Sequence, residues 1–188
     1  MPASRQRRFD GGWRIGYGLA MTEVEDAYDE DEEEELGPSL AYPSLYVLRS
    51  ATYCPECGQA THVYTLGCDA YRDAEEGGEP IEDFHFLRCI ESVPAPLMAL
   101  LKAKLPCYYL DQTREGETPY LMNHCPCGAK LDDDFVSGDV GAAFWPDTPD
   151  GYGDFRLLRL PIEDPIPIVS SYALGGGEYL DFANTWTW

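Results

Sequence analysis

Short runs of strand-forming residues recur along the chain from residue 45 onward. Each run is rich in β-branched, aromatic or leucine side chains, and segments with polar residues, Gly or Pro separate the runs, which predicts β-strands. The predicted strands are residues 45–53, 62–66, 84–90, 119–124 and 155–160. Pro161, Pro165 and Pro167 restrict residues 162–169 to an extended or edge position, because proline cannot donate a ladder hydrogen bond.

One segment, residues 95–105, has the spacing of a helix. Leu97, Leu101 and Leu105 recur every four residues and therefore share one helical face. Pro106 follows and ends the segment, since proline cannot continue a helix. One main helix among several short, largely antiparallel strands predicts an α+β fold.

Acidic residues are concentrated near the N-terminus. Ten of the thirteen residues in 23–35 carry a carboxylate, and Gly37-Pro38 follows. Such a block repels itself and is normally solvated. We therefore predict a disordered acidic tail over residues 1–44 and a single folded domain over residues 45–188. A solubilising role is favoured for the tail over a role in capturing a partner.

The acidity is not confined to the tail. The chain has a formal net charge of −21, and residues 1–40 contribute −7 from 11 acidic and 4 basic residues, which leaves −14 for residues 41–188. A hydrophobic content of 44% is nevertheless enough for a buried core. Such a charge excludes bulk electrostatic binding to nucleic-acid phosphates or to an anionic membrane.

The compartment follows from segments that the sequence lacks. It has no apolar run of about 18 residues, so we predict no membrane span. The basic segment 1–8 is followed by Phe-Asp-Gly-Gly rather than by the apolar stretch of a signal peptide. We therefore predict a cytoplasmic protein, in which the seven cysteines stay reduced or bind metal.

Two cysteine turns carry the most specific chemistry of the chain. Cys54-Pro-Glu-Cys57-Gly and Cys125-Pro-Cys127-Gly are separated by 67 residues. A turn with two nearby cysteines places two thiolates on one side of a bend, and two such turns supply the four corners of a tetrahedral zinc site. The predicted metal ligands are therefore Cys54, Cys57, Cys125 and Cys127, and the cofactor is structural zinc.

The first turn resembles the knuckle of zinc-ribbon proteins, which reads Cys-Pro-x-Cys-Gly, and residues 54–58 match it fully. The second turn is one residue short. Either Cys125 and Cys127 both bind, which is favoured, or His124 replaces Cys125, because His124-x-x-Cys127 restores the usual spacing. The resemblance implies zinc-ribbon-like knuckles joined by a long insertion, a structural zinc site and a binding role, without naming a substrate.

Other chemistries fit the sequence less well. A thiol–disulfide redox enzyme that uses Cys54 and Cys57 is the alternative function, but residues 58–65 form a poor helix after the turn, whereas such enzymes place the first cysteine at a helix N-terminus. The triplet Asp132-Asp-Asp134 lacks the ligand spacing of an EF-hand loop and predicts a solvated loop.

These observations favour a non-enzymatic, zinc-binding interaction protein. Its acidic surface predicts a basic protein as partner, such as a nucleic-acid-binding protein. A sharper version of this hypothesis is a nucleic-acid mimic or inhibitor, whose carboxylates take the place of the closely spaced phosphates of duplex DNA.

Overall fold

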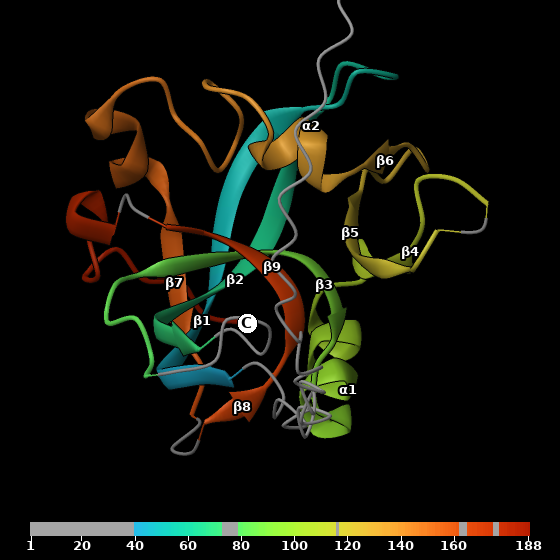
Figure 1. Cartoon of the computed structure of the whole chain (residues 1–188). Coiled ribbons are helices and arrows are strands. Elements are labelled where there is room, and N and C mark those ends of the chain that lie inside the picture. Colours follow the sequence, from blue (N-terminus) through green and yellow to red (C-terminus); the bar gives the residue numbers. More distant parts are fainter. Residues whose placement is uncertain (1–39, 73–78, 116, 162–164, 175–176) are drawn as a thin grey trace, which may run out of the picture. The chain divides into compact units, whose positions relative to one another are not determined.

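A long antiparallel hairpin organises the larger of two sheets (Figure 1). The computed structural model describes residues 40–72, 79–115, 117–161, 165–174 and 177–188, which all belong to the compact unit Glu35–Trp188. In the hairpin, β1 (Leu40–Tyr53) pairs with β2 (Ala60–Arg72) from Tyr53↔Ala60 at the turn to Leu40↔Arg72 at the open end.

The larger sheet has the strand order β7-β1-β2-β3-β9, and β8 also pairs with β1. All of these pairings are antiparallel. The remaining strands of this sheet are β3 (His85–Ser92), β7 (Arg156–Arg159), β8 (Ile166–Pro167) and β9 (Val169–Leu174).

A smaller antiparallel sheet has the order β4-β5-β6. Its strands are β4 (Tyr108–Asp111), β5 (Tyr120–His124) and β6 (Lys130–Leu131). The helical elements are α1 (Ala95–Lys104), the short α2 (Asp133–Ser137), and the 3-10 turns η1 (Pro149–Asp154) and η2 (Gly177–Tyr179).

Each face of the larger sheet packs on its own hydrophobic cluster. Side chains alternate between the two faces of a strand, so Val47 enters one cluster and the adjacent Leu48 enters the other. The first cluster includes Leu97 and Leu101 of α1. The second cluster includes Cys54, and it joins the end of the hairpin to residues of β6 and α2.

The predicted α+β class is confirmed, since short antiparallel strands dominate and α1 is the main helix. The helix predicted over residues 95–105 corresponds to α1. The first strand begins at Leu40, inside the segment predicted as tail, and residues 1–39 of that segment lie outside the described residues. No helix in the described ranges is long and apolar enough to cross a lipid bilayer.

The acidic triplet after β6 differs from its prediction as a solvated loop. The Asp132 carboxylate accepts a hydrogen bond from the Phe135 N–H and caps α2, which is a preferred role of aspartate. Asp133 is buried, and its carboxylate accepts a hydrogen bond from the Cys89 N–H of β3. The prediction was wrong because it treated three adjacent carboxylates alike, whereas the first turn of a helix points them in different directions.

Candidate metal centre

The first cysteine turn closes the long hairpin between β1 and β2. Cys54 follows the last residue of β1, and its N–H donates to the Gln59 carbonyl at 3.0 Å. The Gly58 N–H donates to the Cys54 carbonyl at 2.9 Å, and Gly58 has a φ of 71°. The glycine is needed for this left-handed backbone, which side chains disfavour.

The second cysteine turn closes the β5–β6 hairpin in the same manner with one residue fewer. The Cys125 N–H donates to the Ala129 carbonyl at 2.9 Å, and the Gly128 N–H donates to the Cys125 carbonyl at 2.8 Å. Gly128 has a φ of 95°. The missing residue therefore shortens the turn but preserves its hydrogen bonds and its left-handed glycine.

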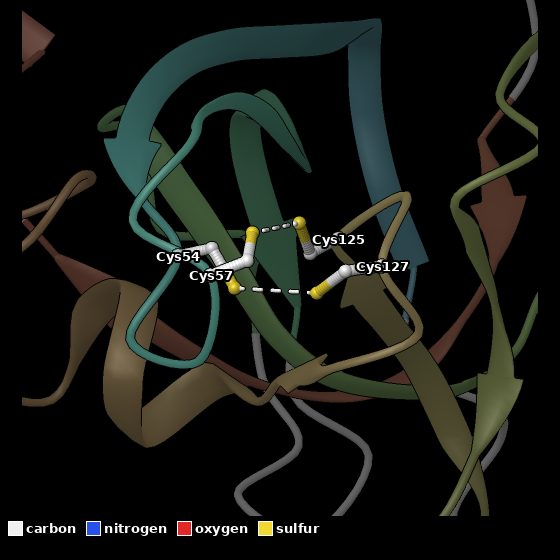
Figure 2. A group of neighbouring side chains, drawn as sticks. All are labelled: Cys54, Cys57, Cys125 and Cys127. Atoms are coloured by element: carbon white, nitrogen blue, oxygen red, sulfur yellow. Dashed lines mark hydrogen bonds between the residues drawn. The ribbon is translucent and has the colours of Figure 1, made fainter.

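The two turns face each other, and their sulfur atoms form one cluster (Figure 2). The four Sγ atoms all lie within 4.8 Å of one another. The Sγ atoms of Cys54 and Cys127 are 3.7 Å apart, and those of Cys57 and Cys125 are 3.6 Å apart. Zn–S bonds of about 2.3 Å in a tetrahedron require sulfur–sulfur distances of about 3.8 Å. The cluster therefore has the dimensions of a four-thiolate zinc site.

The same distances distinguish the cluster from a pair of disulfides. A disulfide bond is about 2.05 Å long, far shorter than the 3.6 and 3.7 Å separations, and all four cysteines are free. Cys54 and Cys125 are buried, whereas Cys57 and Cys127 are exposed. Each turn thus contributes one buried and one exposed cysteine to the cluster.

The thiols of the cluster ionise unequally. Burial raises the pKa of Cys54, but backbone hydrogen bonds from Cys57 and Glu56 and contacts with neighbouring thiols lower it to about 7. A backbone hydrogen bond from Cys127 lowers the pKa of Cys125, but burial and the neighbouring thiols raise it to about 12. Four adjacent thiolates repel one another, so a divalent cation is what allows all four to ionise together.

His124, the alternative ligand, lies outside the sulfur cluster. Its Nε2 is 3.0 Å from Oδ2 of Asp111, and its Nδ1 is 3.1 Å from the Met122 carbonyl oxygen. Its ring stacks on Tyr109 with centroids 3.8 Å apart. The hydrogen bond with His124 is the main cause that lowers the pKa of Asp111 to about 2. The geometry thus brings Cys125, rather than His124, to the cluster.

The remaining cysteines and histidines lie apart from the cluster. Cys68 is buried in the first hydrophobic cluster, and Cys89 and Cys107 are partly buried. His85 is buried and its Nδ1 lies 2.6 Å from the Asp83 carbonyl oxygen, while His62 is exposed. Within the described residues, the group of cysteine, histidine and acidic side chains with metal-binding dimensions is the four-cysteine cluster.

Comparison with known proteins does not extend these observations. No family model matches the chain, and no curated protein or solved structure shows significant similarity to it. The resemblance to zinc ribbons therefore rests on the two turns alone.

Proposed function

We propose that Cys54, Cys57, Cys125 and Cys127 bind a structural zinc ion. The observation that carries this proposal is the grouping of their four Sγ atoms within 4.8 Å of one another. Four thiolates fill the tetrahedral coordination of zinc and leave no position for a substrate, which is the arrangement of structural sites rather than catalytic ones. The metal would cross-link the two cysteine turns and would take no part in a reaction.

The position of the cluster supports a structural role. Two ligands come from the β1–β2 turn of the larger sheet and two from the β5–β6 turn of the smaller sheet (Figure 2). Cys54 and Cys125 also pack in the second hydrophobic cluster. A metal ion at this point fastens the smaller sheet to the end of the long hairpin.

We further propose that this zinc-stabilised body acts by binding a basic protein rather than by catalysis. Support comes from its charge, since residues 41–188 retain −14 of the −21 total. Four thiolates and Zn²⁺ sum to −2, so metal binding does not offset this acidity. A nucleic-acid-binding protein is the partner that such a surface fits best, and occupation of its binding groove would make the chain a mimic of nucleic acid.

The thiol–disulfide alternative has less support. In such enzymes the reactive cysteine lies at a helix N-terminus, which stabilises its thiolate. Here the turn that holds Cys54 and Cys57 is followed by the strand β2. The facing Cys125 and Cys127 have no part in that chemistry, whereas a zinc site uses all four thiols.

Metal analysis of the full chain tests the zinc proposal. We expect one zinc ion per chain in the wild type and a large loss of bound metal in Cys57→Ser and Cys127→Ser. Cys107→Ser, which changes a cysteine outside the cluster, is the control and should keep its zinc. With Co²⁺ in place of zinc, we expect the absorption of a tetrahedral thiolate site. A folded, metal-free wild type that reduces a small disulfide would overturn the proposal in favour of the redox alternative.

The binding proposal requires a separate measurement. Partners captured with the zinc-loaded full chain should be basic, and the Kd of each purified pair should rise steeply with salt because the attraction is electrostatic. Competition by duplex DNA for the same partner would support the mimic. Partners without net positive charge, or a Kd independent of salt, would contradict the proposal and leave the zinc site untouched.

A further inference from the structure

An open cavity of about 560 Å³ lies at one end of the larger sheet, apart from the four cysteines. It is lined by residues of β2, β1 and β7 and of the segment 141–154. The three strands are neighbours in the larger sheet (Figure 1). Its volume is within the usual range of small-molecule sites, about 300–1,000 Å³. The lining contains charged side chains of both signs, among them Arg49, Arg156, Asp147 and Asp154.

Arg49 and Arg156 are directly opposite each other in the β1–β7 pairing. Residues in this relationship share a face of the sheet, and their Cβ atoms lie about 4.5–5.5 Å apart. Neither arginine forms an ion pair within the described part of the chain. Two adjacent like charges are unfavourable, and an anionic ligand between the two guanidinium groups would relieve this repulsion.

The guanidinium of Arg49 is held in place by an aromatic ring. Its Cζ lies 5.0 Å from the centroid of the Trp186 ring. The indole N–H of Trp186 in turn donates to the Val47 carbonyl at 3.3 Å, which fixes the ring against β1. The contact with the ring restricts the Arg49 side chain, so less conformational entropy is lost when its N–H groups bind an oxyanion.

Asp147 and Asp154 line the same cavity, yet neither forms an ion pair with a described residue. The cavity thus holds positive and negative groups that form no direct ion pair with one another. Carboxylates repel a ligand that is only anionic, and they accept hydrogen bonds from hydroxyl groups. A ligand that carries an oxyanion at one end and hydroxyl groups at the other satisfies both kinds of group.

We propose that this cavity binds a phosphorylated sugar, with the phosphate on Arg49 and Arg156 and the sugar hydroxyls toward Asp147 and Asp154. A phosphate dianion matches the two positive charges, and arginine recognises its oxygens through paired N–H groups. The site is independent of the zinc site and of the proposed protein partner.

Isothermal titration of the zinc-loaded full chain with a pentose phosphate, the free pentose and inorganic phosphate tests this assignment. We expect saturable binding of the pentose phosphate, binding of inorganic phosphate at least tenfold weaker, and weaker binding still of the free pentose. Arg156→Gln should weaken pentose phosphate binding at least tenfold. Arg159→Gln, which removes the same charge from an exposed position of β7 outside the cavity, is the matched control.

Each result decides the proposal. Loss of binding in Arg156→Gln, with wild-type binding in Arg159→Gln, supports it. Asp154→Asn should weaken the pentose phosphate more than inorganic phosphate, because only the sugar has hydroxyls to donate. No saturable binding by the wild type, or equal weakening by both arginine variants, overturns it. Circular dichroism of each variant establishes that the fold is retained, and Arg156→Lys serves if the glutamine variant does not fold.

Discussion

Asn123 in β5 bonds to both backbone groups of Tyr64 in β2. Its Oδ1 accepts from the Tyr64 N–H at 2.7 Å, and its Nδ2 donates to the Tyr64 carbonyl at 2.9 Å. The pairing of β3 with β2 runs over Leu66–Cys68 and stops short of Tyr64. A side-chain amide thus takes the place of the missing strand neighbour and joins the two sheets.

Asn123→Ala should lower the free energy of unfolding by about 2–4 kcal/mol, because a buried donor and a buried acceptor on Tyr64 each lose their partner at a cost of about 1–3 kcal/mol. Asn123 is 1% exposed, so bulk water does not reach this amide in the folded protein. Urea unfolding of zinc-loaded protein measures the loss. Asn184→Ala is the comparison, since Asn184 donates to two carbonyls from a more exposed position and its removal should cost less. Equal losses would contradict this view of Asn123.

Gly128→Ala should destabilise the zinc-bound protein by about 1–2 kcal/mol, the cost of a left-handed backbone for a residue with a Cβ. The φ of Gly128 is 95°, and no atom lies within 4 Å of the added Cβ, so strain rather than a clash is responsible. Gly153 has the same open surroundings without a left-handed φ, and Gly153→Ala is therefore expected to be neutral or stabilising. Thermal unfolding at saturating zinc compares the two variants.

Variants of two neighbouring residues, Cys125 and His124, test which of them binds the metal. Cys125→Ser should reduce zinc affinity by orders of magnitude, whereas His124→Asn should retain one zinc ion per chain, because His124 contacts Asp111 instead of the cluster. The same His124→Asn change should raise the pKa of Asp111 from about 2 toward its usual range, since His124 is the main cause of the lowered value. Competition with a chromophoric chelator gives the affinities, and NMR titration gives the pKa. Zinc loss in the His124 variant would identify the histidine as a ligand.

Asp133 should make stability depend on pH. Burial, with smaller contributions from the charges of Asp132 and Asp134, raises its pKa to about 6 despite the hydrogen bond from the Cys89 N–H and the nearby positive charge of Arg88. An unfolded aspartate has a pKa of about 3.9, so the folded state holds the proton more tightly, and this residue's contribution becomes more favourable as pH falls through 6. Between pH 8 and pH 5 the gain is about 1–2 kcal/mol.

Asp133→Asn should remove this gain, since an amide is neutral at every pH and its oxygen still accepts from Cys89. Asp139→Asn is the control, because Asp139 is exposed and is not among the groups that shift the pKa of Asp133. Urea unfolding at several pH values, with the difference from wild type taken at each, isolates the contribution of Asp133 from other acidic groups. Parallel curves for wild type and Asp133→Asn would contradict the prediction.

The elements that the sequence predicted correctly are those whose signals are local. Leu97 and Leu101 lie one turn apart and are both buried, and the strand predicted over residues 119–124 corresponds to β5. Local patterns suffice for these features because the residues that determine them are within a few positions of one another.

The features that the sequence did not predict depend on contacts between residues that are far apart along the chain. The strand β4 was not predicted, because two of its four residues, Tyr109 and Leu110, are exposed and its pairing with β5 is what defines it. The position of His124 depends on Asp111, thirteen residues earlier. Asp132 is a residue type that often caps a helix, but its place in a run of three aspartates obscured this local signal. Spacing thus suggested the four ligands, but tertiary contacts were needed to choose between Cys125 and His124.

The distance along the chain between the two cysteine turns has a consequence for the order of folding. Cys57 and Cys125 are 68 residues apart, whereas each hairpin is local and forms on a timescale of about 1–10 μs. On a ribosome that adds about 5–20 residues per second, the first turn waits for seconds with two thiols before the second turn exists. During this interval the first turn offers only two of the four thiols of the cluster, and both thiols are exposed to oxidants and to competing metal ions. Completion of the cluster therefore marks the moment at which the nascent chain has docked its second hairpin.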